Sequence, residues 1–395
     1  MRIGIDVSTW SNGRGFGRFT RELVTAMTAA PSAHEFILIC DQPIDAALHA
    51  RVIRVNPSRP VTQAAVADGR RGAADVLRFT LAAARARLDV MFYPAVYSWF
   101  PCPPGLRNVL TLHDAIAEHF PHMVFPQARA RALWNLKVRL ACWQASRFLT
   151  VSQAAKREIV TYMKLDGDRI DVTTEGPKPG FGPPDSAAHA ATLARDIRAR
   201  YGLPPDARHF CYVGGFAPHK NVSGVVNAFA RLDAPAHRDI HLLLVGDRSS
   251  QGFSSNVDEL VALIGSIPAL AGRVHFTGYV DDESLAAIYA TAIAMVMPSF
   301  SEGFGLPAIE AMACGTPVVA STQGSLPEVV GSAGILVDPH ELGQIAAAMN
   351  ELACRPEHAA ALGKLARERA ALFTWNKAAA LTLECIERGG GRAPR

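Results

Sequence analysis

The sequence lacks the usual marks of a secreted or membrane-spanning protein. Its 395 residues hold seven scattered cysteines and no Cys-x-x-Cys pair, which argues against a disulfide framework and fits a reducing compartment. No run of 18 apolar residues occurs, so we expect no membrane-spanning helix. The chain starts directly with a strand-like segment, Arg2–Val7, in place of a basic leader and an apolar core. We therefore expect a cytoplasmic protein without a signal peptide.

The chain also lacks a strong net charge. The formal total is +4, but residues 1–180 hold 23 Lys and Arg against 15 Asp and Glu, whereas the remainder holds 17 against 21. A basic first half suits an anionic lipid surface or an anionic acceptor, and it equally fits an Arg-rich habit of the source organism. The near-neutral total and the lack of a recognised binding motif argue against nucleic acid as a partner.

The length of the chain and the alternation of its segments predict two α/β domains. A chain of 395 residues is long for a single core. Seven short apolar segments in the first half and six in the second are typical of strands, and helical stretches separate them. This alternation predicts two doubly wound, Rossmann-like domains that face each other across a cleft, with ligands at the carboxyl ends of the strands.

A stretch rich in glycine and proline, residues 176–184, can continue neither a strand nor a helix and marks a boundary. We predict a first domain over residues 1–182 and a linker with a bridging helix over 183–207. A second domain follows over 208–372, and a last helix and tail over 373–395.

Residues 298–321 are the most informative stretch of the chain. Glu302 and Glu310 stand on either side of a glycine-containing turn that opens into a helix. Pro307 suits the first helical turn, and Gly315 suits the position just past the helix end. The turn between them therefore predicts a helix start whose free amides form an anion site. The amides in question belong to Phe304, Gly305 and Leu306.

This segment closely resembles the Glu-x7-Glu signature of the retaining glycosyltransferases of family four. Seven residues separate Glu302 from Glu310, and Gly-Phe-Gly-Leu-Pro lies between them. The resemblance implies the GT-B fold, with a C-terminal helix that crosses back onto the first domain. It assigns Glu302 to the donor sugar and Glu310 to the ribose of the nucleotide. The alternative is a helix cap whose two glutamates are merely solvated.

A second element of the same family follows the first strand of the second half. Gly214 ends that strand, where a residue without a side chain lets the backbone approach a ligand. Lys220 resembles the family's lysine that holds the donor diphosphate as a point charge. The family often places Arg before this Lys, but His219 stands there. We therefore expect less positive charge around the leaving group, or a charge supplied by another residue. The alternative is a solvated lysine at a helix start.

The resemblance implies three further positions in the donor site. His113 ends a strand of the first half, where the family places a His that faces the donor sugar. Gly15 and Gly17 look like the glycine loop beside sugar and acceptor, although they do not complete a G-x-G-x-x-G fingerprint. The backbone of Tyr279 and Val280 is expected at the nucleobase. The alternative for His113 is a structural histidine, and the alternative for Gly15 and Gly17 is a plain turn.

Residues 126–148 combine five basic residues with tryptophans and leucines. A helix of this kind lies on a membrane surface or packs an apolar stripe on a sheet. We favour core packing and keep contact between its basic face and an anionic membrane as the second interpretation.

Together these features predict a retaining transfer of a hexose from a nucleotide diphosphate sugar to a hydroxyl of a glycan or lipid-linked acceptor. His113, Lys220 and Glu302 are the expected catalytic residues. No Asp-x-Asp motif lies near the predicted donor site, so no metal or other cofactor is expected. The Arg-Ile-Gly-Ile-Asp start and the general resemblance favour GDP-mannose as donor, in the assembly of a surface polysaccharide such as lipopolysaccharide, at the inner face of the plasma membrane. The alternatives are a sugar-nucleotide epimerase or nicotinamide-dependent oxidoreductase on a similar fold, and a catalytically silent sugar-binding subunit.

Overall fold

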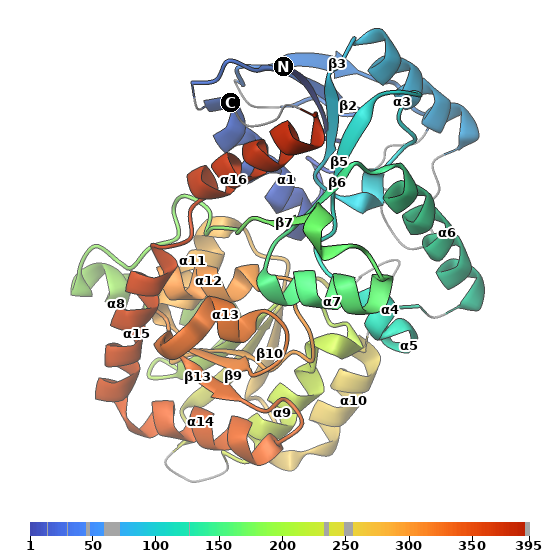
Figure 1. The fold of residues 1–395 in the computed structure, drawn as a ribbon. Helices are drawn as coiled ribbons and strands as arrows, with labels where there is room; N and C mark the ends of the chain where they lie inside the picture. Colours follow the sequence, from blue (N-terminus) through green and yellow to red (C-terminus); the bar gives the residue numbers. More distant parts are fainter. Residues whose placement is uncertain are drawn as a thin grey trace. The chain divides into compact units, whose positions relative to one another are not determined.

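The computed structural model describes residues 1–13, 15–29, 31–44, 48–58, 72–125, 127–232, 237–248 and 256–391. The chain divides into two compact units. The first consists of Met1–Glu175 and the C-terminal segment from Thr374, and the second lies within residues 176–373. Each unit is a parallel sheet with helices packed against it (Figure 1). The expected class of two doubly wound α/β domains is confirmed.

The first unit contains a seven-stranded parallel sheet in the order β3-β2-β1-β4-β5-β6-β7. Its strands are β1 (Arg2–Asp6), β2 (Glu35–Cys40), β3 (Arg51–Arg54), β4 (Val90–Tyr93), β5 (Arg107–Thr111), β6 (Arg147–Thr150) and β7 (Ile170–Val172). The central strands have almost no exposed side chain, because helices cover both faces of the sheet. This burial explains why each strand is a continuous apolar run in the sequence.

The helices of the first unit form two layers. One layer contains α1 (Gly15–Ala29) and α16 (Trp375–Gly389), which pack on each other (Figure 1). The other contains α3 (Ala73–Arg85), α6 (Ala128–Gln144) and α7 (Gln153–Met163), whose buried residues share one core cluster. Helix α1 connects β1 to β2, a step across the sheet toward β3, whereas α3, α6 and α7 each connect a strand to one that lies nearer β7. Because the crossovers are right-handed, steps in opposite directions place their helices on opposite faces of the sheet. Helix α16 thus returns to the first unit, as the resemblance implies.

The second unit contains a six-stranded parallel sheet in the order β10-β9-β8-β11-β12-β13. Its strands are β8 (Arg208–Val213), β9 (Ile240–Val245), β10 (Val274–Gly278), β11 (Met295–Met297), β12 (Val318–Ser321) and β13 (Ile335–Val337). Strand order reverses between β8 and β11, which makes the carboxyl ends of these two strands the topological switch point where such sheets bind ligands.

Helices also cover the second sheet in two layers. Helices α9 (Val222–Ala230), α10 (Val257–Ser266) and α14 (Leu342–Cys354) share a core cluster with β8 and β9. A connected set of helices forms the other layer. It consists of α8 (Ala187–Tyr201), α11 (Asp282–Thr291), α12 (Leu306–Ala313), α13 (Leu326–Val330) and α15 (Pro356–Ala370).

Three local expectations differ from the structure. The sequence analysis placed α8 in a linker, but α8 packs on α11 inside the second unit. It gave no helix for α15, whose sequence is largely alanine and charged residues, nor for the short α4 (Ile116–His119) and α5 (Pro121–Val124). It placed Gly15 and Gly17 in a loop, but both lie in the first turn of α1.

The cysteines divide by exposure. Cys40 and Cys211 are buried, and Cys142 is half-buried. Burial raises the pKa of Cys142 to about 12. Cys354, in α14, is the exposed cysteine. In the described part of the chain, none of the helices has the length and apolar character needed to cross a membrane.

Candidate donor-sugar site in the second unit

The loop after β11 leads directly into α12, and its sequence dictates the turn. Gly305 has a φ of 100°, a left-handed conformation that favours glycine. Pro307 stands in the first turn of α12, where its missing N–H removes no helical hydrogen bond. Gly315, with a φ of 79°, follows the helix end. Pro307 and Gly315 therefore stand where the sequence analysis placed them, and the N–H groups at the start of α12 carry the positive end of the helix dipole.

Glu302 lies in this loop and is bound on two sides. Both of its carboxylate oxygens accept hydrogen bonds from Lys220 Nζ, at 2.7 and 2.6 Å. Ser299 Oγ donates to Oε1 at 2.8 Å. Glu302 is only 7% exposed, so this ion pair is shielded from solvent. The structure thus brings together the two residues that the sequence analysis assigned to the donor sugar and to the diphosphate.

Asn221 connects the Lys220 loop to the Glu302 loop. Lys220 ends a short 3-10 turn, η3 (Pro218–Lys220), and Asn221 follows with a φ of 53°. The Asn221 side chain donates from Nδ2 to the carbonyl oxygens of Pro298 and Pro339, at 3.0 and 2.8 Å. The sequence analysis did not assign Asn221 a role. The lysine–asparagine pair in the motif was the only signal that could have indicated one.

His219 adds no positive charge beside Lys220. Burial, with the Lys220 ammonium as a second cause, lowers the pKa of His219 to about 3, so the imidazole is neutral at physiological pH. Its backbone carbonyl accepts from the N–H of Phe300 at 2.8 Å, which gives a second connection between the two loops. The substitution of the family's arginine therefore leaves Lys220 as the cation paired with Glu302.

Gly324 and Ser325, the two residues before α13, contact the backbone of the Glu302 loop. A Cβ atom at Gly324 would lie 2.8 Å from the backbone nitrogen of Glu302, so this position requires glycine. Ser325 donates its N–H to the Glu302 carbonyl at 3.3 Å and its hydroxyl to the Phe304 carbonyl at 2.8 Å. These contacts fix the backbone that carries Glu302.

The remaining predicted residues of the second unit lie at the same edge of the sheet. Glu310 stands in the second turn of α12 and is 1% exposed. Gly214 follows β8, with a φ of 150°, and its carbonyl oxygen would lie 2.1 Å from a Cβ atom at Gly246. Tyr279 follows β10 with 77% of its surface exposed, whereas Val280 is buried. An exposed aromatic ring at a strand end offers a flat face on which a base could stack.

The predicted residues of the first unit form a separate group at the carboxyl ends of β1 and β5. His113 Nε2–H donates to the carbonyl of Pro94 at 2.9 Å, and Nδ1 lies 3.7 Å from Oε1 of Glu175. The Phe19 ring packs edge-on against the imidazole, with 4.6 Å between ring centroids. A Cβ atom at Gly17 would lie 2.1 Å from the Asn12 carbonyl oxygen. Close packing of α1 against the preceding turn therefore explains this glycine, in addition to the predicted role at the sugar.

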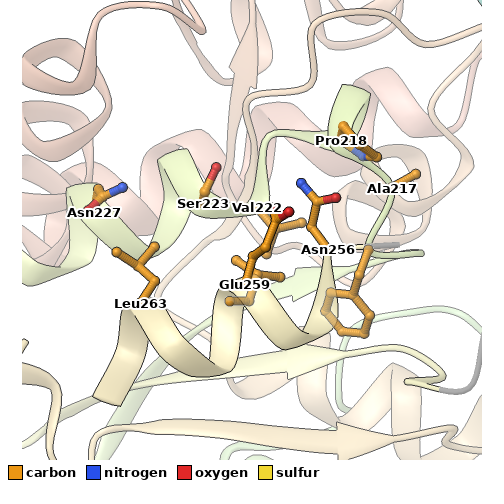
Figure 2. Close-up of a pocket in the computed structure, with 10 residues that line it drawn as sticks. Ala217, Pro218, Val222, Ser223, Asn227, Asn256, Glu259 and Leu263 are labelled. Carbon is orange, nitrogen blue, oxygen red and sulfur yellow. The ribbon is translucent and has the colours of Figure 1, made fainter. Parts of the chain in front are cut away.

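Two cavities lie beside these groups. One, of about 320 Å³, opens between α9 and α10; Figure 2 shows Ser223 and Asn227 of α9 on one side and Glu259 and Leu263 of α10 on the other. It includes none of the predicted donor residues. A smaller cavity of about 30 Å³ borders His113 in the first unit, and Glu118 lines it. Burial raises the pKa of the Glu118 carboxyl.

Comparison with known families agrees with this geometry. The family model described as "Glycosyltransferase Family 4" matches residues 13–176, and that described as "Glycosyl transferases group 1" matches residues 194–369. The first unit therefore matches the family 4 glycosyltransferase model, and the second unit matches the group 1 glycosyltransferase model. The two matches cover the two units in turn, and the second contains Lys220, Glu302 and Glu310.

Curated relatives of the chain include two bacterial enzymes. "O-antigen chain mannosyltransferase B" of Escherichia coli is 33% identical over 61% of this chain and 60% of its own length. "D-inositol 3-phosphate glycosyltransferase" of Mycolicibacterium smegmatis is 34% identical over 59% of this chain and 50% of its own length. The matched region thus spans half to three-fifths of these relatives.

Solved structures with the same fold cover nearly the whole chain. Sucrose-phosphate synthase from Thermosynechococcus elongatus superposes with a TM-score of 0.75 at 23% identity, over 98% of both chains. Anabaena HepE, solved with UDP and glucose, gives 0.73 at 19% identity over 98% of this chain and 99% of its own. WaaG, a glycosyltransferase involved in lipopolysaccharide biosynthesis, gives 0.72 at 16% identity over 99% of this chain and 100% of its own. The GT-B fold is therefore confirmed.

Proposed function

We propose that this glycosyltransferase transfers a hexose from a nucleoside diphosphate sugar to a hydroxyl of a glycan or lipid-linked acceptor, with retention of the anomeric configuration. The observation that carries the proposal is the contact between Lys220 and Glu302 beside the start of α12. An ammonium and a helix N-terminus suit a diphosphate, and an adjacent carboxylate suits the hydroxyls of the sugar that it carries.

In this proposal the chemistry rests on stabilising the leaving group. The bond between the sugar C1 and the diphosphate oxygen breaks, and a bond from the acceptor oxygen to C1 forms on the same face. The departing phosphate takes the acceptor proton. Lys220 and the amides of Phe304–Leu306 stabilise the charge that develops on the diphosphate, an effect of about 3 kcal/mol per donor. The proposed route assigns this charge to protein groups and uses no divalent cation.

Glu302 is assigned to binding the sugar, not to nucleophilic attack. Its two oxygens already accept bonds from Lys220 and Ser299, and an ion-paired carboxylate is a weak nucleophile. His113, Gly15 and Gly17 are assigned to the sugar from the first unit, Tyr279 and Val280 to the base, and Glu310 to the ribose. These roles are part of the proposal.

We further infer that the donor is GDP-mannose and that the product enters a surface polysaccharide. The name of the E. coli relative, an O-antigen chain mannosyltransferase, supports this choice. A lipid-linked acceptor would place the reaction in the cytoplasm, at the inner face of the plasma membrane. A thermal-shift series with GDP, UDP, ADP and TDP tests the base, because a ligand that binds the folded state raises its unfolding temperature.

The activity itself is tested by incubation with GDP-mannose and with UDP-glucose, followed by measurement of the released nucleoside diphosphate. We expect release from GDP-mannose, and a Lys220→Met variant should slow it by about a hundredfold or more. Conversion of the donor to another sugar nucleotide would indicate an epimerase, and oxidation with a nicotinamide cofactor would indicate an oxidoreductase. Donor binding without release, with a range of acceptors, would indicate a silent subunit.

A further inference from the structure

Helix α6 exposes a stripe of large apolar side chains to solvent. Its members recur at intervals of three, four and three residues, which places them on one face of a helix. They are Leu133, Leu136, Leu140 and Trp143. Trp143 has 83% of its surface exposed, an unusual state for the largest apolar side chain. We call these four residues the α6 stripe.

Core packing does not account for the α6 stripe, because a different face of the helix packs on the sheet. On that face Val138 and Ala141 pack in the core against the sheet, with Trp134 partly buried beside them, and Ala130 packs in a smaller cluster with residues of α4 and α5. The sequence analysis favoured core packing as the reason for the apolar residues of this helix. The structure shows core packing by one face and leaves a second apolar face in water.

The positive charge of α6 indicates what kind of partner could cover this stripe. The helix contains four basic residues and no acidic one. Arg129 stands four residues before Leu133 and Arg139 three residues after Leu136, so helical geometry places both on the side of the stripe. Both arginines are exposed. Lys137 is engaged within the fold, because its ammonium donates to the Tyr97 carbonyl.

Helix α3 adds to the same side of the first unit. Leu77 and Leu81, one turn apart, are exposed, and Arg78 and Arg85 belong to the same helix. The buried residues of α3 and α6 share one core cluster, so both helices cover the same face of the sheet. Exposed apolar side chains and basic residues therefore occur on two helices of the first unit, whose sequence carries the excess of positive charge.

We propose that the α6 stripe docks on an anionic phospholipid membrane. The helix would lie parallel to the surface, with the leucines among the acyl chains, Trp143 at the interface and Arg129 and Arg139 at the lipid phosphates. A second copy of the chain fits less well, because a symmetric contact would bring the same arginines together. The inference rests on the proposed function only for its purpose, which is access to a lipid-linked acceptor.

The test is co-sedimentation of the full chain with phosphatidylcholine vesicles that contain or lack phosphatidylglycerol, without donor or acceptor. We expect binding to the anionic vesicles alone. The variant Leu136→Ser/Leu140→Ser/Trp143→Ser should lose at least about tenfold in affinity. The variant Arg129→Gln/Arg139→Gln should lose roughly thirtyfold. The matched control is Val261→Ser/Leu372→Ser, which removes two exposed apolar side chains from the second unit and should bind as the unmodified chain does.

Three results would overturn the proposal. They are absence of binding to anionic vesicles, equal binding by the stripe variant, and a solution dimer that the stripe variant dissociates without any vesicle binding. Thermal unfolding and the shift produced by nucleoside diphosphate monitor folding of each variant. Vesicle binding is measured without donor or acceptor, so absence of vesicle binding would not contradict the proposed transferase activity. Absence of transferase activity would likewise not contradict membrane binding by the α6 stripe.

Discussion

Lys220 Nζ lies 2.6 and 2.7 Å from the two carboxylate oxygens of Glu302, 82 residues further along the chain. The side chains are 22% and 8% exposed, so each charge depends on the other for its compensation. Removal of one partner from such a pair leaves a poorly solvated charge. The ion pair therefore contributes to the stability of the folded state as well as to the proposed binding of the donor diphosphate.

Lys220→Met should lower the free energy of unfolding by roughly 3 kcal/mol and reduce donor turnover by about a hundredfold or more. The double variant Lys220→Met/Glu302→Gln should recover much of the stability but none of the activity, because no buried charge remains and no cation faces the diphosphate. Urea unfolding and nucleoside diphosphate release measure the two effects. Full activity in the double variant would remove Lys220 from the mechanism.

Glu310→Gln should weaken binding of the nucleoside diphosphate by about tenfold or more, since a hydrogen bond to a charged group is lost. Isothermal titration with GDP and UDP measures the change. Glu328→Gln, in α13 of the same unit, is the control and should bind as before. An unchanged affinity for Glu310→Gln would separate this residue from the ribose.

Asn221 is expected to contribute to stability through two separable effects. Asn221→Gly keeps the left-handed backbone but loses the bonds to Pro298 and Pro339, and should cost about 2 kcal/mol. Asn221→Ala should cost roughly 1 kcal/mol more, because its φ of 53° is unfavourable for alanine. Chemical unfolding of the two variants measures the difference. Equal stability of both would mean that the backbone conformation carries no cost.

His113→Gln should reduce turnover by about a hundredfold through misplacement of the sugar, while affinity for the free nucleoside diphosphate stays unchanged. Comparison of the turnover rate with binding of GDP tests this separation. His122→Gln, an exposed histidine of the same unit, is the control. A loss of GDP affinity in His113→Gln would indicate a role at the nucleotide instead.

Stability of the second unit should fall as the pH drops below about 6.5. Burial lowers the pKa of His209 to about 4 and of His219 to about 3, and it also lowers the pKa values of His241 and His275 from 6.5. The folded state then binds fewer protons than the unfolded state, so acid favours unfolding, by at most about 1.4 kcal/mol per histidine for each pH unit.

Urea unfolding at pH 7.5 and 5.5 measures this loss. His209→Gln should reduce the pH dependence, whereas His122→Gln should leave it as it is. A free energy of unfolding that is the same at both pH values would show that these imidazoles accept protons in the folded state.

Local signals in the sequence were enough for most of the fold. Strands buried on both faces are apolar runs, so their existence could be predicted from the sequence, and Pro307 and Gly315 mark the ends of α12. Helix α15 was missed because it is rich in alanine and charged residues and lacks a clear apolar stripe. Gly17 was placed in a loop because glycine is unfavourable within a helix, and the close approach of Asn12 that explains it depends on the conformation of the turn before α1.

The candidate site was predictable only where a motif carried it. Glu302 and Lys220 came from separate motifs, and the ion pair between them depends on the order of β8 and β11 in the sheet. Glu175, beside His113, and Asn221, between the two loops, were not assigned roles because their contacts are made across the fold. The exposure of Trp143 could not be predicted either. Apolar residues at helical spacing occur both on the face of α6 that packs in the core and on the face that is exposed, so the spacing does not tell the two faces apart.

The exposure of Cys354 makes it a natural attachment point for a fluorescent label. A cysteine thiolate attacks the double bond of a maleimide, and burial keeps the remaining cysteines, Cys142 included, unreactive by lack of access or by a raised pKa. A dye on α14 would therefore report on the second unit of the unmodified chain. Ligand titrations could then be followed optically, with all seven native thiols left in place.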